Sequence, residues 1–300
     1  MFSGPAMSSA KVDSAFFFMV AAAAVLLFLV MTVTVVFVVR YRAKRHPRPV
    51  PVKDSTLLEI VWTVIPLALV MVMFYFGWVN FEFLRTPPTG SMPVQVTARQ
   101  WSWLFRYENG REEGLLRVPL GRPVSLSMTS VDVIHCLFIP AFRIKEDCVP
   151  GLKTHLWFAA DEAGTYELFC SEYCGVGHSH MRSQVIVMPA ADFDRWYQAP
   201  EEKGAESQGL KVLTSKGCIG CHSLDGSRST GPSFKALLGK QEVVISTGRE
   251  RTVTVDAEYI RRSLLEPNSD VVKGYQAMMP QLPVTDEELK EIVAYLETIK

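Results

Sequence analysis

Neither sign of charge is in excess in this sequence, and histidine and cysteine are both scarce. The 31 basic and 31 acidic residues cancel, so nothing indicates the polybasic surface of a nucleic-acid-binding protein. Among 300 residues there are six histidines and six cysteines. Metal chemistry is therefore expected only where these few side chains gather along the chain.

Charge is absent altogether from a long run near the N-terminus. No charged residue occurs from Ala15 to Val39, and a second apolar run extends from Ile60 to Val79, interrupted by Pro66. Each run is long enough to cross a bilayer, and neighbouring helices tolerate a proline kink there. We place the spans at about 15–39 and 58–79, within a two-helix transmembrane hairpin over residues 1–85.

Basic residues set the orientation that is expected for this hairpin. Only Lys11 precedes the first span, whereas six basic residues follow it: Arg40, Arg42, Lys44, Arg45, Arg48 and Lys53. The positive-inside rule makes this loop cytoplasmic, so both termini and everything after residue 80 should lie on the periplasmic or outer side of a bacterial inner membrane. A cleaved signal peptide is the alternative for the first span, but its apolar run is too long and its positive charge follows it.

Twelve residues, CSEYCGVGHSHM, carry most of the expected chemistry. Cys170, Cys174, His178 and Met181 supply two thiols, an imidazole and a thioether, and His135 upstream offers a second imidazole. These groups are copper ligands, and a mononuclear blue-copper site needs only one thiolate. Because two thiolates can bridge two metals, the motif predicts a dinuclear copper centre that relays electrons. Zinc would make no use of the methionine, and a Cys170–Cys174 disulfide would leave the nearby histidine and methionine unexplained.

Short strand-like segments fill the region around this motif. VQVTARQWSWLFRY, VSLSMTS, HLWFAA, GTYELF and SQVIVMP have alternating or β-branched sequences, and glycine, proline and Asn-Gly turns separate them. They predict an all-β, cupredoxin-like domain over residues 90–190, with the copper loop between its last strands. Because alternate residues of a strand share a face, Trp101 and Trp103 are expected on one face.

A second cofactor is indicated by KGCIGCHS. Cys218, Cys221 and His222 form CxxCH, the pattern of covalent c-type haem attachment. The later segments GPSF and MMP resemble those of class I c-type cytochromes, which are all-α. This resemblance implies that the GPSF proline carbonyl orients the imidazole, and that Met279, directly before a proline, is the sixth iron ligand in preference to Met278. Such His/Met ligation leaves no open position, so the domain should carry electrons and bind no substrate.

The C-terminal segment TDEELKEIVAYLETIK has the apolar period of a helix. Thr285 followed by Glu288 predicts a capping box at its start. We expect the cytochrome c domain to occupy residues 209–300, joined to the copper domain by a polar linker at 191–208.

The segments DVIH, FIPAF, DxVPG, AGTY and CSEYCGxxHSxM together resemble subunit II of the haem-copper cytochrome c oxidases, over about residues 15–190. The resemblance implies the side-chain ligands of a dinuclear copper centre, CuA: His135, Cys170, Cys174, His178 and Met181. It also implies that Glu172 gives its backbone carbonyl to one copper and turns its carboxylate toward a magnesium ion at the border with subunit I.

A fused C-terminal cytochrome c domain is typical of caa3-type oxidases, to which the resemblance extends. It implies that a cytochrome c or a quinol-oxidising complex, in some cases within a supercomplex, gives electrons to the haem. They would then pass through the copper centre to subunit I, which reduces oxygen to water and translocates protons. Subunit III and small subunits are further expected partners. The two spans contain no histidine, so haem a must bind to another chain.

The same resemblance gives roles to two residues outside the ligand sets. It implies that electrons reach the copper domain at Trp101, for which core or interface packing is the ordinary alternative. It also implies that Glu59 marks the entrance of a proton pathway into subunit I. The alternative for Glu59 is an acidic residue stabilised by the positive end of a helix dipole.

The expected fold class is therefore a multidomain membrane protein: two transmembrane α-helices, an all-β cupredoxin-like domain and an all-α class I cytochrome c domain. One alternative is the electron-accepting subunit of a CuA-containing nitric oxide reductase, which would use the same ligands. A membrane-tethered copper-delivery module is another, but it would need no haem.

Five remaining histidines and cysteines lie outside the two ligand sets, among them His46 in the basic loop. Cys136 and Cys148 depart from the family pattern; the oxidising compartment favours a disulfide between them, and two buried free thiols are the alternative. His155 and His180 are expected on the surface.

Overall fold

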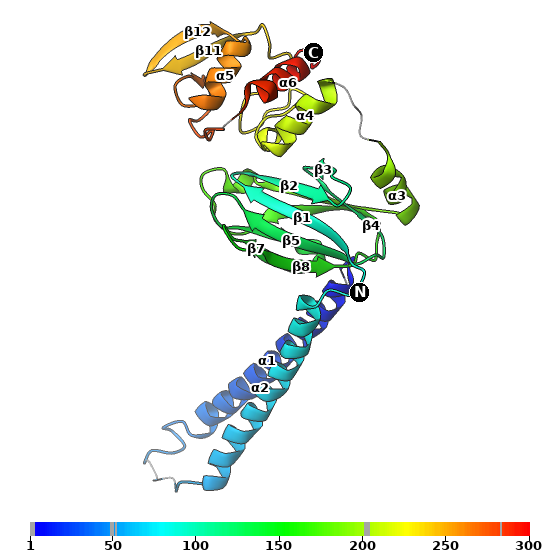
Figure 1. Ribbon diagram of the computed structural model, residues 1–300. Helices are drawn as coiled ribbons and strands as arrows, with labels where there is room; N and C mark the ends of the chain where they lie inside the picture. The colour runs from blue at the N-terminus through cyan, green and yellow to red at the C-terminus, as the bar shows by residue number, and fades with distance from the viewer. Residues whose placement is uncertain (1–3, 49–50, 52, 201–204, 283) are drawn as a thin grey trace. The chain divides into compact units, whose positions relative to one another are not determined.

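The computed structural model describes residues 4–48, 51, 53–200, 205–282 and 284–300 (Figure 1). The chain divides into two compact units. One is the pair of N-terminal helices; the other comprises residues 5–7 together with everything from residue 87 onward.

The first unit is a helical hairpin of α1 (Met7–Arg40) and α2 (Thr56–Arg85). Both helices are long and apolar enough to cross a membrane, and each extends past the span expected for it. The rings of Phe18 and Phe76 meet edge to face with centroids 5.8 Å apart. The apolar side chains otherwise face outward along both helices, and in a bilayer lipid would cover such surfaces.

Two five-stranded sheets form the cupredoxin-like domain. Their strands are β1 (Met92–Arg99), β2 (Ser102–Tyr107), β3 (Glu112–Glu113), β4 (Leu116–Pro119), β5 (Val124–Ser130), β6 (His135–Ile139), β7 (Ile144–Cys148), β8 (Thr154–Phe158), β9 (Gly164–Cys170) and β10 (Arg182–Met188). One sheet has the order β3-β2-β1-β5-β8 and the other the order β4-β10-β9-β6-β7. Burial alternates along β1, β5 and β10, as expected where one face of each sheet packs on a shared core.

The segment around the two tryptophans differs from its expected form. It is a hairpin of β1 and β2, with Val94 opposite Tyr107 and Arg99 opposite Ser102. Trp101 lies in the turn between the strands, and Trp103 lies on β2. The strand alternation that was expected to place both rings on one face therefore does not apply to Trp101.

Residues near the start of the chain pair with the cupredoxin-like domain. Ala6 forms an antiparallel bridge with Ala160, and the Asp161 amide donates to the Pro5 carbonyl at 2.9 Å. The chain segment before α1 is thereby joined to the loop between β8 and β9.

A helix occupies the first half of the expected linker. α3 (Ala190–Gln198) buries Phe193 completely, and its Tyr197 carbonyl accepts a hydrogen bond from Asn109 at 2.7 Å. The guanidinium of Arg111 lies 4.8 Å from the ring centre of Trp196, a cation–π contact. These contacts attach α3 to the β-domain. Residues 201–204 of the expected linker lie outside the described residues, and α4 begins at Ala205.

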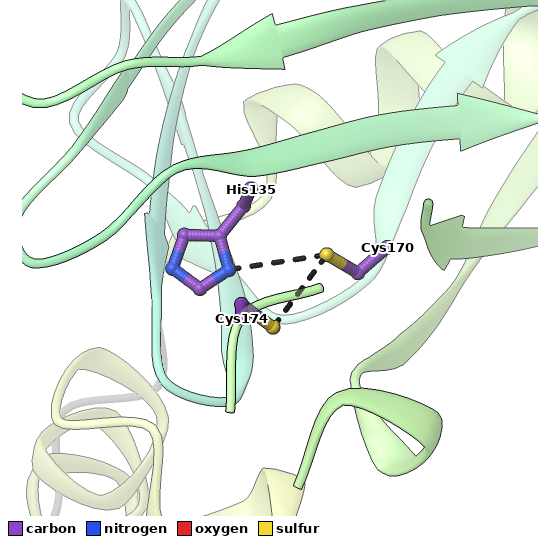
Figure 2. A group of neighbouring side chains, drawn as sticks. All are labelled: His135, Cys170 and Cys174. Carbon is purple, nitrogen blue, oxygen red and sulfur yellow. Dashed lines mark hydrogen bonds between the residues drawn. The ribbon is translucent and has the colours of Figure 1, made fainter. Parts of the chain in front are cut away.

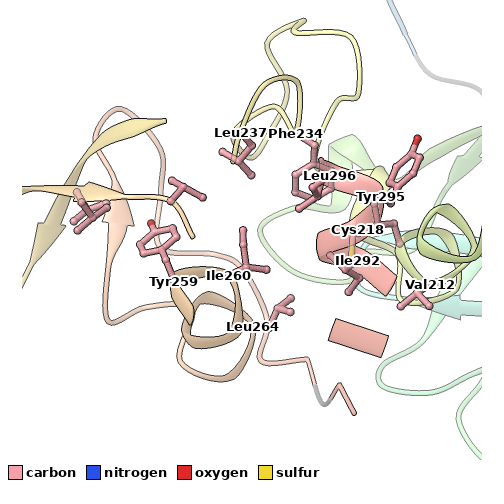
Figure 3. Packing of buried hydrophobic residues seen from close by; sticks show 14 residues of the cluster. Val212, Cys218, Phe234, Leu237, Tyr259, Ile260, Leu264, Ile292, Tyr295 and Leu296 are labelled. Atoms are coloured by element: carbon pink, nitrogen blue, oxygen red, sulfur yellow. The ribbon is translucent and has the colours of Figure 1, made fainter. Parts of the chain in front are cut away.

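The C-terminal domain contains helices and an unexpected small sheet. Its elements are α4 (Ala205–Ser215), α5 (Ala257–Leu265), α6 (Asp286–Leu296), β11 (Gln241–Ser246), β12 (Arg249–Thr254) and β13 (Val271–Val272). The three strands pair in the order β12-β11-β13, whereas the sequence resemblance indicated only helices. The expected capping box at Thr285 and Glu288 is present. A single cluster of buried side chains from α4, α5, α6 and β11, shown in Figure 3, forms the core.

Candidate metal and cofactor sites

Strand pairing brings the expected copper ligands together. β6 and β9 are antiparallel neighbours, and Leu137 lies opposite Cys170. His135 precedes Leu137 by two residues and so points to the same face of the sheet. The chain leaves β9 at Cys170 and returns at β10 after a loop that carries Cys174, His178 and Met181. The copper loop therefore joins the last two strands of the domain, as the sequence predicted.

Three of these side chains meet at the centre of the cluster (Figure 2). The Cys170 Sγ atom lies 3.9 Å from Nδ1 of His135 and 3.8 Å from Sγ of Cys174. All three residues are buried, and their donor atoms lie within 4.8 Å of one another. A metal ion with bonds of about 2.0–2.3 Å, as zinc makes to the same donor types, would bridge such separations.

The remaining expected donors extend this cluster on both sides. His178 Nδ1 lies 3.4 Å from the Cys174 sulfur, and the Met181 sulfur lies 3.9 Å from the same atom. The backbone carbonyl of Glu172 is 3.2 Å from the Cys170 sulfur. Six donors thus form one contiguous set, with an imidazole beside each of two central thiols. These donors are the soft ligands and imidazoles that copper favours.

The two central thiols differ in acidity. Burial and the adjacent Cys170 raise the pKa of Cys174 to about 12. Burial would also raise the pKa of Cys170, but contact with the His135 ring and the Cys136 backbone outweighs it and lowers that pKa to about 7. Hydrogen bonding to a charged form favours that form. Cys170 is therefore the more readily ionised thiol of the pair.

A carboxylate that the sequence analysis missed orients His135. Asp132 Oδ1 lies 2.8 Å from Nε2 of His135, and its other oxygen accepts from the Gln100 amide at 2.7 Å. Burial would raise the pKa of Asp132, but the hydrogen bonds from Gln100 and His135 lower it below its usual value. An ionised carboxylate only accepts, so Nε2 carries the proton and Nδ1 faces the sulfur. The signal was present in DVIH, three residues before the histidine.

Both tryptophans of the hairpin contact this cluster. The indole nitrogen of Trp101 donates to the Cys174 carbonyl at 3.1 Å, and the Trp103 ring lies 6.4 Å from that of His135. A Cβ atom at Gly177 would come within 2.3 Å of the Trp101 ring. The copper loop therefore needs glycine at this position, because the indole packs directly against its backbone.

The expected disulfide between Cys136 and Cys148 is absent, and both residues are free buried thiols. Cys148 lies opposite His135 across β6 and β7, whereas Cys136 lies opposite Asp147. Adjacent residues of a strand point to opposite faces, so the two cysteines cannot face one another. Burial raises the pKa of Cys136 to about 11 and that of Cys148 to about 12, which keeps both as unreactive thiols.

The CxxCH residues follow α4 and line a large cavity in the C-terminal domain. His222 Nδ1 donates to the Pro232 carbonyl at 2.6 Å, and the Phe234 ring stacks on the imidazole with centroids 4.5 Å apart. A Cβ at Gly231 would come within 2.6 Å of the imidazole. Burial lowers the pKa of His222, so its ring is neutral. Nε2 is therefore left free as a metal donor, as haem iron requires.

The same cavity is lined by both candidate methionines. Cys218, Cys221 and His222 lie along its wall together with Met278 and Met279. Met279 also packs against the buried core of the domain. The cavity therefore has the thiols, the neutral imidazole and the thioether that a covalently attached, His/Met-ligated haem needs.

The other expected positions lie on exposed surfaces. Glu59 is in the first turn of α2 and is exposed. The Glu172 side chain is exposed beside the copper loop, and His155 and His180 are exposed as expected.

Comparisons with known families agree with this division of the chain. Residues 3–77 match the transmembrane domain of cytochrome c oxidase subunit II, residues 111–188 match its periplasmic domain, and residues 207–300 match cytochrome c. The fold and the matched families define a membrane-bound electron-transfer subunit with a copper-type domain and a cytochrome c domain.

Individual relatives sharpen this assignment. The chain is 30% identical over 282 residues to cytochrome c oxidase subunit 2 of Alkalihalophilus pseudofirmus, covering 88% of this chain and 80% of that protein. It is 29% identical over 252 residues to the Synechocystis subunit of the same name, covering 67% of this chain and 76% of that protein. It is also similar to the crystal structure of the periplasmic domain of subunit II of cytochrome oxidase from Bradyrhizobium japonicum, with 28% identity and a TM-score of 0.35, covering 37% of this chain and 94% of that structure.

The chain belongs to the cytochrome c oxidase subunit 2 family. It is subunit II of a haem-copper oxidase, of the branch with a fused cytochrome c domain, and its second domain is periplasmic. These relatives are oxidase subunits, so they do not favour the nitric oxide reductase alternative.

Proposed function

We propose that this subunit relays electrons from a c-type haem to a dinuclear copper centre, CuA, and on to subunit I. Cys218 and Cys221 would attach the haem, and His222 and Met279 would bind its iron. The copper centre would be bound by His135, Cys170, Cys174, His178 and Met181 with the Glu172 carbonyl. When bound, these groups supply one-electron redox chemistry.

The contiguous set of six donors carries this proposal. The two central sulfurs lie 3.8 Å apart, and each has an imidazole nitrogen within 4 Å. A single metal would leave one thiol without use, whereas two ions sharing both thiolates use every donor. The paired strands β6 and β9 would hold His135 and Cys170 in place, so the site should change little in geometry when it gains an electron.

The haem assignment is supported by the chemistry of the cavity. His222 is held through Nδ1, so its ring presents Nε2, and Met279 lies along the same cavity with the core behind it. With both axial positions filled by protein, such a haem passes electrons and binds no substrate.

The pairing of residues 5–7 with the loop after β8 supports the expected orientation. A chain that crosses the membrane twice returns to its starting side, and this pairing joins the segment before α1 to the domain that follows the second span. Together with the basic loop between the spans, this favours both termini on the periplasmic side.

Three residues would connect the subunit to its partners. Trp101, which donates to the Cys174 carbonyl, would be where electrons reach the copper domain. Glu59 would stand at the entrance of a proton pathway in subunit I. The exposed carboxylate of Glu172 would reach a magnesium ion at the same border. Subunit III, small subunits and a cytochrome c or quinol-oxidising donor would complete the assembly.

The test is metal analysis and electron paramagnetic resonance of the complex purified through a tag on this chain. We expect three copper ions for each haem c, two at this centre and one at the haem-copper centre of subunit I, and the hyperfine pattern of one electron shared equally by two copper nuclei. A single-copper pattern would overturn the dinuclear site. Cyanide-sensitive oxygen uptake with reduced cytochrome c tests the donor, and Trp101→Phe should slow haem-to-copper transfer while leaving both cofactors bound.

A further inference from the structure

The segment that carries Met279 is attached to the small sheet that the sequence did not predict. β13 pairs with β11, with Val271 opposite Ile245, and the Lys273 amide donates to the Val243 carbonyl at 2.8 Å. This backbone pairing ends a few residues before the methionine.

One buried carboxylate reinforces the attachment. Asp270 Oδ2 accepts from Arg251 on β12 at 2.6 Å and from Arg262 on α5 at 3.0 Å. The Asp270 side chain is 5% exposed, whereas those of Arg251 and Arg262 are 49% and 39% exposed. Asp270 also lines the cavity that holds His222 and Met279. A carboxylate in the haem pocket wall is thus fixed by two different elements.

The far end of the same segment is held by α5 as well. The Leu282 amide donates to the Leu264 carbonyl at 3.0 Å, one turn or less from Arg262. The methionine therefore lies between two attachment points that share one scaffold.

We propose that Asp270, Arg251 and Arg262 are positioning residues for Met279, through which the β11–β12 hairpin and α5 hold the sixth ligand against the haem iron. This rests on the proposed ligation by His222 and Met279. The hairpin is then part of the electron-transfer machinery, because loss of the methionine ligand lowers the potential of a His/Met haem.

How far each of the three side chains is exposed to water predicts which substitution weakens methionine ligation more. Removing the carboxylate leaves two arginines that water can solvate. Removing both arginines leaves a buried charge with no partner, which is the costlier change. Arg251→Gln/Arg262→Gln should therefore weaken methionine ligation more than Asp270→Asn does.

The hairpin offers a matched control. Lys273 and Glu250 form a second ion pair between the methionine segment and β12, at 2.9 Å, with both side chains more than half exposed. Exposed pairs contribute little. Glu250→Gln removes a β12 contact of the same kind without touching the cavity, so it should leave the methionine ligand unchanged.

The experiment uses the purified complex and follows the red-region charge-transfer absorbance of ferric His/Met haem during urea titration, together with the haem midpoint potential. For Asp270→Asn we expect the fraction lacking methionine ligation, at a fixed urea concentration below the transition, to rise about tenfold or more. The potential should fall in step, and Glu250→Gln should match the parent chain. Arg251→Gln provides a second variant, which changes a half-exposed side chain and so disturbs the buried core less than Asp270→Asn does.

Two results would overturn the proposal, in distinguishable ways. If Asp270→Asn and the double arginine variant both match the parent chain, the positioning role is wrong, and the assignment of His222 and Met279 as iron ligands is unaffected. If the parent chain lacks the charge-transfer absorbance and Met279→Leu leaves the haem spectrum unchanged, the ligand assignment itself is wrong, and the positioning role falls with it.

Discussion

The two cofactor sites of this chain are built in opposite ways. The copper donors come from one loop and the start of a neighbouring strand, and each lies within 4 Å of another donor atom. The haem donors lie in two segments far apart in the sequence and line a shared cavity. Paired strands thus shape the candidate copper site, whereas the candidate haem site is a cavity lined mostly by several elements of the C-terminal domain.

The largest effect is expected from a substitution that removes the copper centre and leaves the haem site intact. Cys170→Ser removes a thiol that both coppers would share, so the copper centre should be lost while haem c remains attached. Oxygen uptake fed by cytochrome c should fall by more than about a hundredfold, since changes outside the ligand set alone cost up to that much. Copper and haem content are measured on the same preparation. Ser179→Ala, an exposed change in the same loop, is the control; a copper content in Cys170→Ser equal to that of the parent complex would contradict the ligand set.

A substitution in α3 should lower the stability of the copper domain and leave that of the haem domain unchanged. Phe193 of α3 is 1% exposed and packs beside Trp196 and Tyr197. Phe193→Ala should destabilise the copper domain by about 3–5 kcal/mol, the usual range for a buried phenylalanine. Thermal unfolding monitored by copper absorbance should shift, and that monitored by haem should not. The exposed neighbour Asp194→Ala controls for helix effects; a shift in both signals would mean that the two domains unfold together.

A smaller effect is expected from the carboxylate behind His135. Asp132→Asn keeps the shape but weakens the hold on the histidine tautomer, so copper affinity should fall about 10–100-fold. The measurement is competition with a copper chelator, with His180→Gln as a control histidine that is exposed and outside the cluster. Unchanged affinity in Asp132→Asn would show that the strand alone orients His135.

The sequence indicated the side chains that the structure brings together in the donor cluster, but not all of the scaffold around them. Spacing is local, so CSEYCGVGHSHM was sufficient to indicate four of the clustered side chains, whereas Asp132 was missed because its contact with His135 depends on the turn before β6. The Cys136–Cys148 disulfide was wrong because strand register, which spacing does not reveal, turns the two thiols to opposite faces.

In the haem domain, the sequence analysis missed a whole element of the fold. Short patterns predicted the closing helix, which is confirmed, and the CxxCH attachment residues, which stay a prediction, but they did not predict the β11–β12 hairpin. QEVVIS and RERTVT have the alternation of strands around a Thr-Gly turn, and the resemblance to an all-α family concealed that signal. In the same way, α3 was missed within the expected linker because its stability comes from aromatic packing on the β-domain and not from helix propensity.

The smallest expected effect is a pH dependence confined to the haem site. The hydrogen bond from Arg251 chiefly, with Arg262 nearby, holds the pKa of Asp270 below its usual value despite burial. A carboxyl whose pKa is lower when folded stabilises the fold above its unfolded pKa of about 3.9, and this stabilisation is lost as pH falls through the folded pKa. The urea midpoint for methionine ligation should therefore be insensitive to this group between neutral pH and about pH 5. It should then decline on further acidification in the parent chain, and less in Asp270→Asn. Parallel acid curves for the two would show that Asp270 is not ionised at the pocket wall, and the copper domain, which lacks this residue, should give the same curve in both.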